Sequence, residues 1–270
     1  MRLSAQKSAA ITCFAGVVAI VWIAPYVWML LTSFKTLPEI VANPFALPHA
    51  VSFGAYREVS AAIPLGRYFG TTVLMAVLIS LLQIALALPA GYALAKLRFA
   101  GRRAAFGLVL ACLLVPAQVT FVPVFLMFAK VHLVNTMAAL VLPFAVSALG
   151  TFLVRQSLSS VPDEIIEAAR LDGASEATII YRILAPLLRP TLVSLFLVSF
   201  VFHYNDYFWP LVMTTDDSVR TLPLGVALLR EQGTGVRWHI VMAANVLLSA
   251  PVIALFSVAQ KHLIRAVGGR

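Results

Sequence analysis

Long apolar runs separated by short polar segments dominate this chain. Six of them approach the roughly 20 residues that a helix needs to cross a bilayer, and the fourth is the shortest. The runs cover residues 11–31, 68–95, 104–129, 137–154, 191–210 and 240–260. The pattern therefore predicts an all-α membrane protein with six transmembrane helices, forming a single transmembrane domain over residues 1–270.

The composition supports the assignment to a membrane. Hydrophobic residues make up 61% of the 270 residues and charged residues 11%, whereas soluble domains are roughly half apolar and about a quarter charged. The mean hydropathy of +0.94 agrees. A soluble fold of this length could not bury so much apolar surface, so the composition excludes the ordinary soluble classes.

The net charge of +9 indicates membrane topology rather than nucleic-acid binding. The basic residues lie in short segments between the apolar runs, where they set the orientation of a membrane protein. With the N-terminus inside, 13 of the 20 lysines and arginines fall on the inner side and seven on the outer side. Lys96, Arg98, Arg102 and Arg103 form the strongest cluster. This bias places both termini in the cytoplasm.

Prolines interrupt both the apolar runs and the first long loop. Each removes a backbone donor and tends to kink a helix, and in lipid the freed carbonyl has to find another partner. Two interpretations stay open, namely irregular packing or bent helices that line a pathway. The prolines concerned are Pro25, Pro89, Pro116, Pro123, Pro143 and Pro251. Further prolines in residues 32–66 predict an irregular segment on the outer side.

A charged stretch over residues 157–190 joins the fourth and fifth runs on the cytoplasmic side. Ser160 is placed to cap a helix whose first turn carries acidic residues, which the helix dipole favours. Gly173 can adopt the left-handed turn that ends this helix, and Ser175 can cap a second helix over residues 176–184. The stretch therefore predicts a helix, a glycine turn and a second helix beneath the membrane, with Pro186 and Pro190 marking the bend into the fifth run.

One face of the first of these helices has the residues that a docking surface needs. Ile165, Ala168 and Ala169 share a face by the three- and four-residue spacing, and Asp172 follows one turn later. Small alanines let another backbone come close, and Glu167 can pair with an arginine of a partner. The spacing alone leaves two possibilities open, a docking site or a surface helix that only connects two spans.

The residues of this stretch resemble a known family. "EAARLDGAS" followed by "ILAPLLRP" is similar to the EAA loop of ATP-binding-cassette (ABC) importer permeases. The resemblance covers nearly the whole chain, because "SFKTLPEI", "GYALAKLRFAGRR", "NDYFWPLVMTTDDSVRTLPLGVALL" and "QKHLIRAVGG" are similar to the MalG-like, carbohydrate-uptake branch.

The resemblance implies that the charged stretch is a coupling helix, which fits a cleft on a cytoplasmic ATPase and transmits its movement to the membrane helices. On this analogy Glu167 pairs with a basic group of the ATPase, Ala168 and Ala169 allow close seating, and Gly173 permits the turn beside Asp172. These five residues are the expected ATPase-coupling site.

The resemblance also implies partners and a location. The partners are a second, homologous permease subunit (MalF-like), two ABC ATPase subunits, an extracytoplasmic sugar-binding protein and membrane lipid, but no nucleic acid. The location is the bacterial inner membrane. ATP and magnesium are expected on the ATPase, and no cofactor on this chain, which lacks the G-x-x-x-x-G-K-[ST] sequence. The five histidines show no metal-ligand spacing, and no catalytic residue is expected.

Polar side chains inside the runs are candidates for a pathway or a gate. They are His203, Asn205, Asp206, Gln83, Gln118 and Asn245. The first three cluster at the outer end of the fifth run, where they form either a solvated helix end or an outer gate. The other three either hydrogen-bond a sugar hydroxyl or hold helices together.

Three functions are open to a chain of this kind. The first is the transport subunit of an ATP-driven sugar importer, not itself an enzyme, with an importer of glycerol phosphate or a polyamine as the nearest alternative. The second is an ion-coupled transporter, which needs charged groups along its pathway, yet Asp206 is the only formally charged side chain within the runs. The third, a membrane enzyme or scaffold, needs a catalytic cluster or a large extramembrane module.

Overall fold

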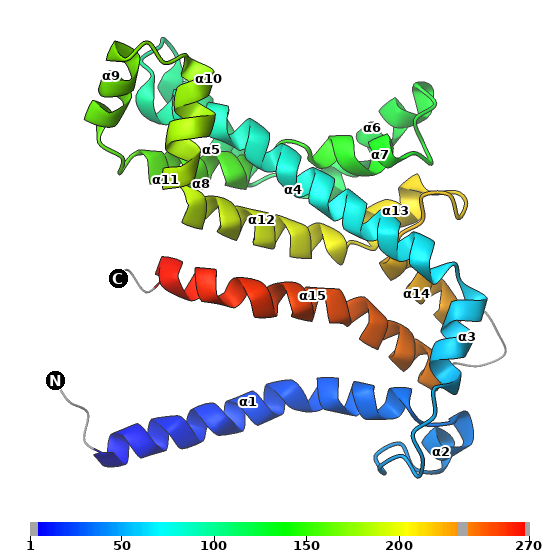
Figure 1. Ribbon diagram of the computed structural model, residues 1–270. Coiled ribbons are helices and arrows are strands. Elements are labelled where there is room, and N and C mark those ends of the chain that lie inside the picture. The colour runs from blue at the N-terminus through cyan, green and yellow to red at the C-terminus, as the bar shows by residue number, and fades with distance from the viewer. Residues whose placement is uncertain (1–4, 232–236, 268–270) are drawn as a thin grey trace. The chain divides into compact units, whose positions relative to one another are not determined.

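All secondary-structure elements of the described residues are helices, and no strand occurs among them (Figure 1). The computed structural model describes residues 5–231 and 237–267, and it leaves the side chains of residues 5–10, 117–118, 231 and 258–267 undescribed. The prediction of an all-α protein is confirmed. The elements are α1 Ala5–Ser33, α2 Leu37–Ala42, α3 Gly54–Ala62, α4 Leu65–Lys96, α5 Arg102–Cys112, α6 Ala117–Lys130, α7 Met137–Val141, η1 Leu142–Phe144, α8 Ala148–Leu158, α9 Asp163–Leu171, α10 Glu176–Thr178, η2 Ile179–Leu184, α11 Ala185–Leu187, α12 Arg189–Tyr204, α13 Phe208–Met213, α14 Leu222–Glu231 and α15 Trp238–Val267.

Among the described residues, three helices are long and apolar enough to cross a membrane. They are Ile11–Ser33, Leu65–Lys96 and Trp238–Ser257. Two bent pairs, Met137–Phe144 with Ala148–Leu158 and Glu176–Leu187 with Arg189–Tyr204, raise the number of candidate spans to five if each pair counts as one. Six spans therefore stay a prediction.

The third predicted run is not one helix. The sequence predicts a continuous helix over residues 104–129, but the structure breaks it into α5 and α6 between Cys112 and Ala117. Pro116 explains the break, because it has no backbone N–H to donate and it disfavours the helical conformation of the residue before it.

The fourth and fifth runs are bent or shortened in the structure. The fourth bends by 43° between residues 144 and 148. The helix of the fifth run ends at Tyr204 rather than at residue 210, and a separate short helix, α13, begins at Phe208. The bend before the fifth run measures 85° at Leu188, between the two prolines expected to mark it.

The loop over residues 32–66 is more ordered than its prolines predict. It contains α2 and α3. The Glu39 carboxylate accepts hydrogen bonds from the backbone N and the hydroxyl of Thr36, at 2.8 and 2.9 Å, and so closes the start of α2. Pro38 lies in the first turn, where its missing N–H leaves no gap. The expectation of an irregular segment holds for residues 43–53, which contain Pro44 and Pro48, but not for α2 and α3.

Two compact units divide the chain. The first comprises residues 1–65 and 225–253. Within it, Tyr26 and Leu30 of α1 and Val246 and Ile253 of α15 line an apolar hollow of about 220 Å³. The second unit comprises residues 66–224 and 254–270; it holds the charged stretch and is described next.

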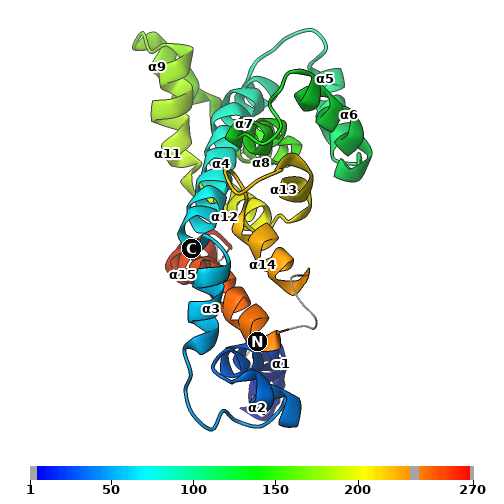
Figure 2. The ribbon, with the colours of Figure 1, turned by 90° about the vertical axis from the view of Figure 1, so that its right-hand side faces the viewer.

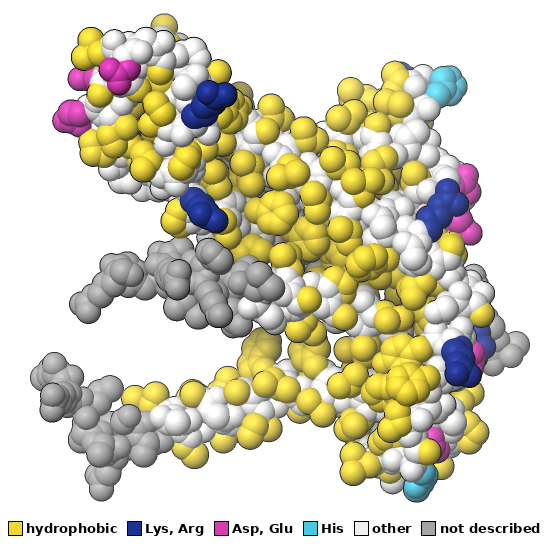
Figure 3. Space-filling view, in the orientation of Figure 1, with side chains coloured by type: hydrophobic (Ala, Val, Ile, Leu, Met, Phe, Trp, Pro, Cys, Tyr) yellow, Lys and Arg dark blue, Asp and Glu magenta, His cyan; other side chains and the backbone are white. Residues whose placement is uncertain are grey.

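Helix α4 is the central element of the second unit. In Figure 2, α9 and α11 lie on one side of α4, and α5 and α6 lie on the other. Ser80 of α4 donates a buried hydrogen bond to Ser199 of α12 at 3.1 Å, which fixes these two helices side by side. Exposed leucines such as Leu74 and Leu81 cover the outer surface of α4, and Figure 3 shows this apolar surface. Such a surface suits contact with lipid.

Side chains satisfy the carbonyls that the breaks in the fourth run leave free. Pro143 cannot donate to the carbonyl of Ala139, and the indole N–H of Trp209 donates to that oxygen instead, at 2.9 Å. Gln83 donates from Nε2 to the carbonyl of Phe144, at 2.9 Å. These contacts confirm that the freed carbonyls find partners within the protein.

Gly91 lets α4 and α8 approach closely. A Cβ atom at this position would lie 2.6 Å from Cγ1 of Val154 and 2.9 Å from the backbone N of Arg155. Real carbon contacts are not that short, and a backbone atom cannot turn away as a side chain can. The close approach places the end of α8, and the charged stretch that follows it, against α4.

We predict that Gly91→Ala destabilises the protein. The added methyl group overpacks the contact with α8, and overpacking costs about 1–3 kcal/mol, more than the gain of about 1 kcal/mol in helix propensity. Gly70→Ala is the matched control, because Gly70 lies in the same helix with no atom within 4 Å of its would-be Cβ. Thermal unfolding in detergent should show a lower midpoint for Gly91→Ala alone; a raised midpoint for both variants would contradict the close contact.

Candidate functional site

The charged stretch folds as a helix, a turn and a second helical segment beside the C-terminal end of α4 (Figures 1 and 2). Helix α9 carries Asp163 and Glu164 in its first turn, where the helix dipole favours negative charge. The predicted cap by Ser160 is wrong, because its hydroxyl donates to the carbonyl of Ser157 at 2.8 Å. Pro162 takes the N-cap position without a side-chain hydrogen bond.

The end of α9 confirms the predicted glycine turn. Gly173 has a φ of +79°, a left-handed conformation that favours glycine. Its N–H donates to the carbonyl of Arg170 at 3.0 Å, and the N–H of Ala174 donates to that of Ala169 at 3.0 Å. This pair of bonds is the Schellman motif that closes helices. Ser175 then caps α10 by accepting a hydrogen bond from the N–H of Thr178 at 3.3 Å, as predicted.

The inner face of α9 is buried against the rest of the second unit. Ile166 and Ala169 are 3% and 7% exposed, and they share a cluster with Tyr92 of α4 and Leu158 of α8. The prediction that Ala169 shares one face with Ile165 and Ala168 is therefore wrong. Ala169 lies one turn after Ile166 and points inward with it.

The outer face of α9 is open. Glu167, Ala168 and Asp172 are exposed, as is Gly173. Leu171 is 90% exposed, which is unusual for a leucine in the most polar part of the chain. Sequence reasoning missed this residue, although the signal was present: an apolar residue stands three positions after Ala168 on the same helical face. Figure 3 shows acidic side chains gathered over α9.

Lys96 makes the first polar connection between α4 and the charged stretch. Its ammonium donates hydrogen bonds to Oδ1 of Asp163 and to the carbonyl of Val161, each at 2.5 Å. The side chain of Lys96 is only 9% exposed and that of Asp163 is 72% exposed. The hydrogen bond from Lys96, with a smaller contribution from the charge of Arg98, holds the pKa of the Asp163 carboxyl below its usual range.

Tyr92 makes the second connection. Its hydroxyl donates to Oε2 of Glu176 at 2.6 Å and accepts from Nη2 of Arg170 at 2.9 Å. Arg170 also donates from Nε to Oε1 of Glu176, at 2.9 Å. The buried tyrosine of α4 thus joins the last turn of α9 to the first turn of α10.

The third connection uses a carbonyl that a proline frees. Pro89 inside α4 cannot donate to the carbonyl of Ala85. The hydroxyl of Tyr181, in the π-helical segment η2, donates to that oxygen at 3.0 Å. One proline of α4 therefore provides an attachment point for the charged stretch.

Gln83 and His203 are the only two of the predicted pathway residues that meet among the described side chains. They are 7% and 4% exposed, and the Nε2 atoms are 3.4 Å apart. The ring of Phe144 lies against His203, with 4.9 Å between the ring centroids. The interpretation of His203 as part of a solvated helix end is wrong, whereas Gln83 connects α4 to the broken fourth run.

The other four predicted pathway residues lie apart from this pair. Asn205 is exposed and donates to the carbonyl of Val201 at 2.8 Å, while Asp206 accepts from the N–H of Trp209, in the first turn of α13, at 3.3 Å. Asn245 belongs to the first unit, where it donates to the carbonyl of Val241 at 2.7 Å. The side chain of Gln118 lies outside the described residues.

The described side chains contain no group of three His, Cys, Asp or Glu residues that could hold a metal ion. The three connections and the apolar inner face of α9 instead describe a mechanical arrangement. They hold an exposed helical face firmly at one end of the long apolar helix α4.

We predict that the Lys96–Asp163 contact weakens only in acid. The pKa of Asp163 is lowered in the folded state, so its stabilising effect is complete above the unfolded value of about 3.9 and is lost as the pH falls through the folded pKa. Amide hydrogen exchange in the first turn of α9 should be slower in the wild type than in Asp163→Asn by a constant ratio from pH 8 to about 5. That ratio should shrink below about pH 4.

Glu164→Gln is the matched control, since Glu164 lies in the same turn and has no ion-pair partner among the described residues. It should show no such loss of protection at neutral pH. Equal protection of the wild type and Asp163→Asn at pH 7 would contradict the contact.

We predict further that Tyr181→Phe lowers the free energy of unfolding by about 1 kcal/mol, because the carbonyl of Ala85 loses its only side-chain donor. Tyr207→Phe is the control, since Tyr207 is 38% exposed against 47% for Tyr181 and has no side-chain hydrogen bond in the described part of the chain. Denaturant unfolding of the purified protein measures both. An effect of Tyr207→Phe as large as that of Tyr181→Phe would refute the assignment.

Comparison with known proteins gives the family. The sequence model of the family described as "Binding-protein-dependent transport system inner membrane component" matches residues 87–269. The chain is 31% identical over 258 residues to the arabinooligosaccharides transport system permease protein AraQ of Halalkalibacterium halodurans, covering 93% of this chain and 92% of the relative. It is 32% identical over 205 residues to the sn-glycerol-3-phosphate transport system permease protein UgpE of Yersinia enterocolitica, covering 76% and 73%.

The fold also matches a solved structure. A chain of a bacterial ABC transporter involved in the import of the acidic polysaccharide alginate superposes with a TM-score of 0.84 at 22% identity, over 97% of this chain and 98% of that one. The resemblance carried by "EAARLDGAS" is thus confirmed by the family match, and the structural likeness agrees with it in fold. The chain belongs to the family of inner-membrane components of binding-protein-dependent transport systems and is a multi-pass inner-membrane protein.

Proposed function

We propose that this chain is the permease subunit of an ABC importer that moves a sugar or oligosaccharide inward by alternating access, driven by ATP hydrolysis on partner subunits. The AraQ relative, whose name refers to arabinooligosaccharides, matches over 93% of the chain. The fold likeness to a subunit of an alginate importer agrees with this class. The substrate would pass between this permease and a second, homologous one.

The proposed topology has six spans with both termini in the cytoplasm. The inner excess of lysine and arginine supports this orientation. The third span would consist of α5 and α6 together, broken at Pro116. The fourth would be the bent pair Met137–Phe144 and Ala148–Leu158, and the fifth would run through α12 into α13. Irregular backbone is tolerated inside a membrane where protein or a water-filled cavity surrounds it.

The coupling role of residues 157–190 rests on one observation above all. The face of α9 that carries Glu167, Ala168 and Asp172 is exposed, while its opposite face is buried and three polar connections attach the charged stretch to α4. An exposed face on a firmly attached helix is what a separate motor needs in order to move a membrane helix. In this proposal Glu167 pairs with a basic group of the ATPase and Leu171 adds an apolar contact.

Within the proposal, Ala168 allows close seating of the ATPase, whereas Ala169 acts from inside by letting α9 lie close to the cluster around Tyr92. Gly173 sets the direction in which the chain leaves the exposed face. The chain itself performs no catalysis. ATP and magnesium would bind the two ATPase subunits, and a binding protein outside the membrane would deliver the solute.

Glycerol phosphate is the second candidate substrate, because the UgpE relative is 32% identical over 76% of the chain. Membership in a binding-protein-dependent family argues against an ion-coupled transporter. Uptake of radiolabelled arabinooligosaccharide and of glycerol 3-phosphate, by vesicles containing the whole transporter, separates the two substrates.

We predict that Glu167→Arg leaves the permease folded and inserted but lowers ATP turnover and solute uptake of the assembled transporter at least about tenfold, because a like charge at a docking contact costs several kcal/mol. The measurements are ATP hydrolysis stimulated by the binding protein, solute uptake, and the amount of ATPase that co-purifies.

Arg57→Glu is the matched control, an exposed charge reversal on α3, and should leave all three quantities near the wild-type values. Normal uptake by Glu167→Arg would exclude a coupling role for this face of α9.

A further inference from the structure

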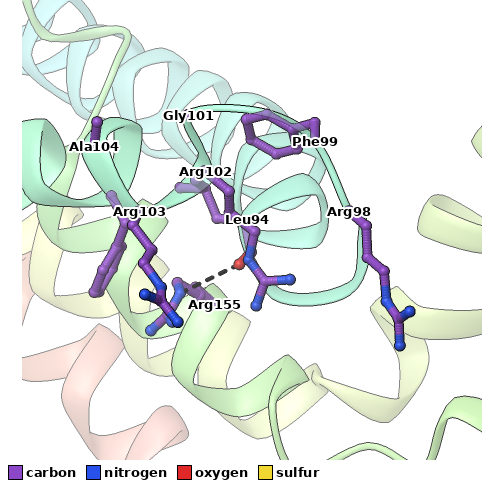
Figure 4. A pocket seen from close by; sticks show the side chains of 9 residues that line it. Leu94, Arg98, Phe99, Gly101, Arg102, Arg103, Ala104 and Arg155 are labelled. Carbon is purple, nitrogen blue, oxygen red and sulfur yellow. Dashed lines mark hydrogen bonds between the residues drawn. The ribbon is translucent and has the colours of Figure 1, made fainter.

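An arginine-rich hollow lies at the other side of the C-terminal end of α4. Its volume is about 790 Å³, and the loop after α4, the start of α5 and one residue of α8 line it. Figure 4 shows Arg102, Arg103 and Arg155 along one side of the hollow, with Arg98 apart from them. We name these residues, together with Phe99 and Phe106, the arginine hollow.

Two of the guanidinium groups are held in place by the protein. Arg155 donates from Nε to the carbonyl of Leu94 at 3.4 Å, and its guanidinium carbon lies 3.7 Å from the centre of the Phe106 ring. Arg102 donates from Nη1 to the carbonyl of Leu97 at 3.0 Å. Each retains further N–H donors for a ligand. The hollow is therefore organised before any ligand enters it.

Arg103 has no hydrogen-bond or ion-pair partner among the described residues and is exposed. The lining of the hollow contains no aspartate or glutamate. The carboxylate of Asp163 pairs with Lys96, and among the arginines of the hollow it interacts with the charge of Arg98. Within the described part of this chain, the charges of Arg102, Arg103 and Arg155 are thus left without an anionic partner.

Clustered like charges repel one another, and an anion shared between them removes the repulsion. Guanidinium groups match the oxygens of a phosphate in pairs, through two parallel N–H donors. Basic pockets between membrane helices on the cytoplasmic side bind phospholipid headgroups. The chemistry of the hollow therefore points to a phosphate group rather than to a sugar.

We propose that the arginine hollow binds a phosphate group, with Arg103 as its main direct contact and Arg102 and Arg155 as pre-organised donors. The surroundings favour a phosphate carried by an anionic phospholipid. Phe99 is 45% exposed at the rim, and Leu108 on the following helix is 67% exposed, so acyl chains would find an apolar surface beside the phosphate. The proposal rests on the membrane location of the protein and on the proposed cytoplasmic position of this end of α4, and not on the identity of the transported solute.

The test uses the full-length permease in detergent and measures its affinity for a fluorescent phosphatidylglycerol. The variants are Arg103→Gln, which keeps the Arg102–Leu97 hydrogen bond, Arg102→Gln/Arg103→Gln, and the charge-conserving Arg103→Lys. Arg182→Gln/Arg189→Gln is the matched control: it removes the same charge from two exposed arginines outside the hollow.

Each arginine removed from the hollow should weaken lipid binding about fivefold, since one basic residue contributes about 1 kcal/mol near an anionic surface. Arg103→Lys should lose less than Arg103→Gln, and the control pair should lose little. Unchanged affinity of Arg103→Gln with the protein folded, or an equal loss in the control pair, would overturn the site.

Two further measurements, a comparison of lipid headgroups and competition by inorganic phosphate, show whether the bound phosphate belongs to a lipid or to a free compound. Preference for phosphatidylglycerol over phosphatidylcholine, without displacement by inorganic phosphate, assigns the site to an anionic lipid. Displacement by millimolar inorganic phosphate, lost in Arg103→Gln, assigns it to a free phosphate compound. Binding of none of these probes would refute the proposal.

Discussion

The packing of the inner face of α9 onto α4 and α8 is the contact on which the rest of the structure depends. Ile166 and Ala169 enter the cluster around Tyr92 and Leu158, and burial of a side chain the size of isoleucine contributes about 1.5–3 kcal/mol. Once this face is buried, the opposite face must be exposed. The phase of one short helix thus decides which residues are available to a partner.

Polar contacts then fix the position of the charged stretch along α4. Lys96, Tyr92 and the carbonyl of Ala85 lie along α4, and each holds a different part of the charged stretch. Surface ion pairs contribute little alone, but Tyr92 is 2% exposed and the side chain of Lys96 is 9% exposed. A displacement of α9 should therefore be passed on to α4 rather than absorbed in a flexible loop.

The membrane environment explains why polar side chains occur where they do. Lipid offers no hydrogen bonds, so each carbonyl freed by a proline or a helix break needs a partner from the protein. Tyr181, Trp209 and Gln83 supply three such donors. Of the two roles that the sequence leaves open for Gln83, the structure shows the second, because its side chain holds a broken helix to its neighbour.

Local signals in the sequence predicted the end of α9 and the start of α10 correctly. Gly173 and Ser175 act within one turn of their own positions, and both predictions hold. The cap by Ser160 failed because the hydroxyl found a nearer carbonyl behind it. The inward position of Ala169 could not be predicted, since both neighbouring alanines fit a helical face and only the contact with α4 separates them.

The helix break at Pro116 and the contacts between residues far apart in the chain could not be predicted from the sequence. The break at Pro116 was visible as a proline but not as the end of a helix, because prolines inside α1 and α4 leave those helices continuous. The connections from Lys96 and Tyr92 to the charged stretch span more than 60 residues of chain. Their residue types gave no sign of pairing, because the pairing comes from the fold.

The central claim is that the charged stretch and α4 move as one body, and a distance measurement tests it most directly. Spin labels at Ala177 on α10 and Leu86 on α4, both exposed, would report their separation in the assembled transporter without nucleotide and with ATP bound. The account predicts one narrow distance distribution that stays the same to within about 2 Å, the size of ordinary packing shifts. A larger change or a broad distribution in either state would show that the stretch moves independently of α4 and would contradict the account.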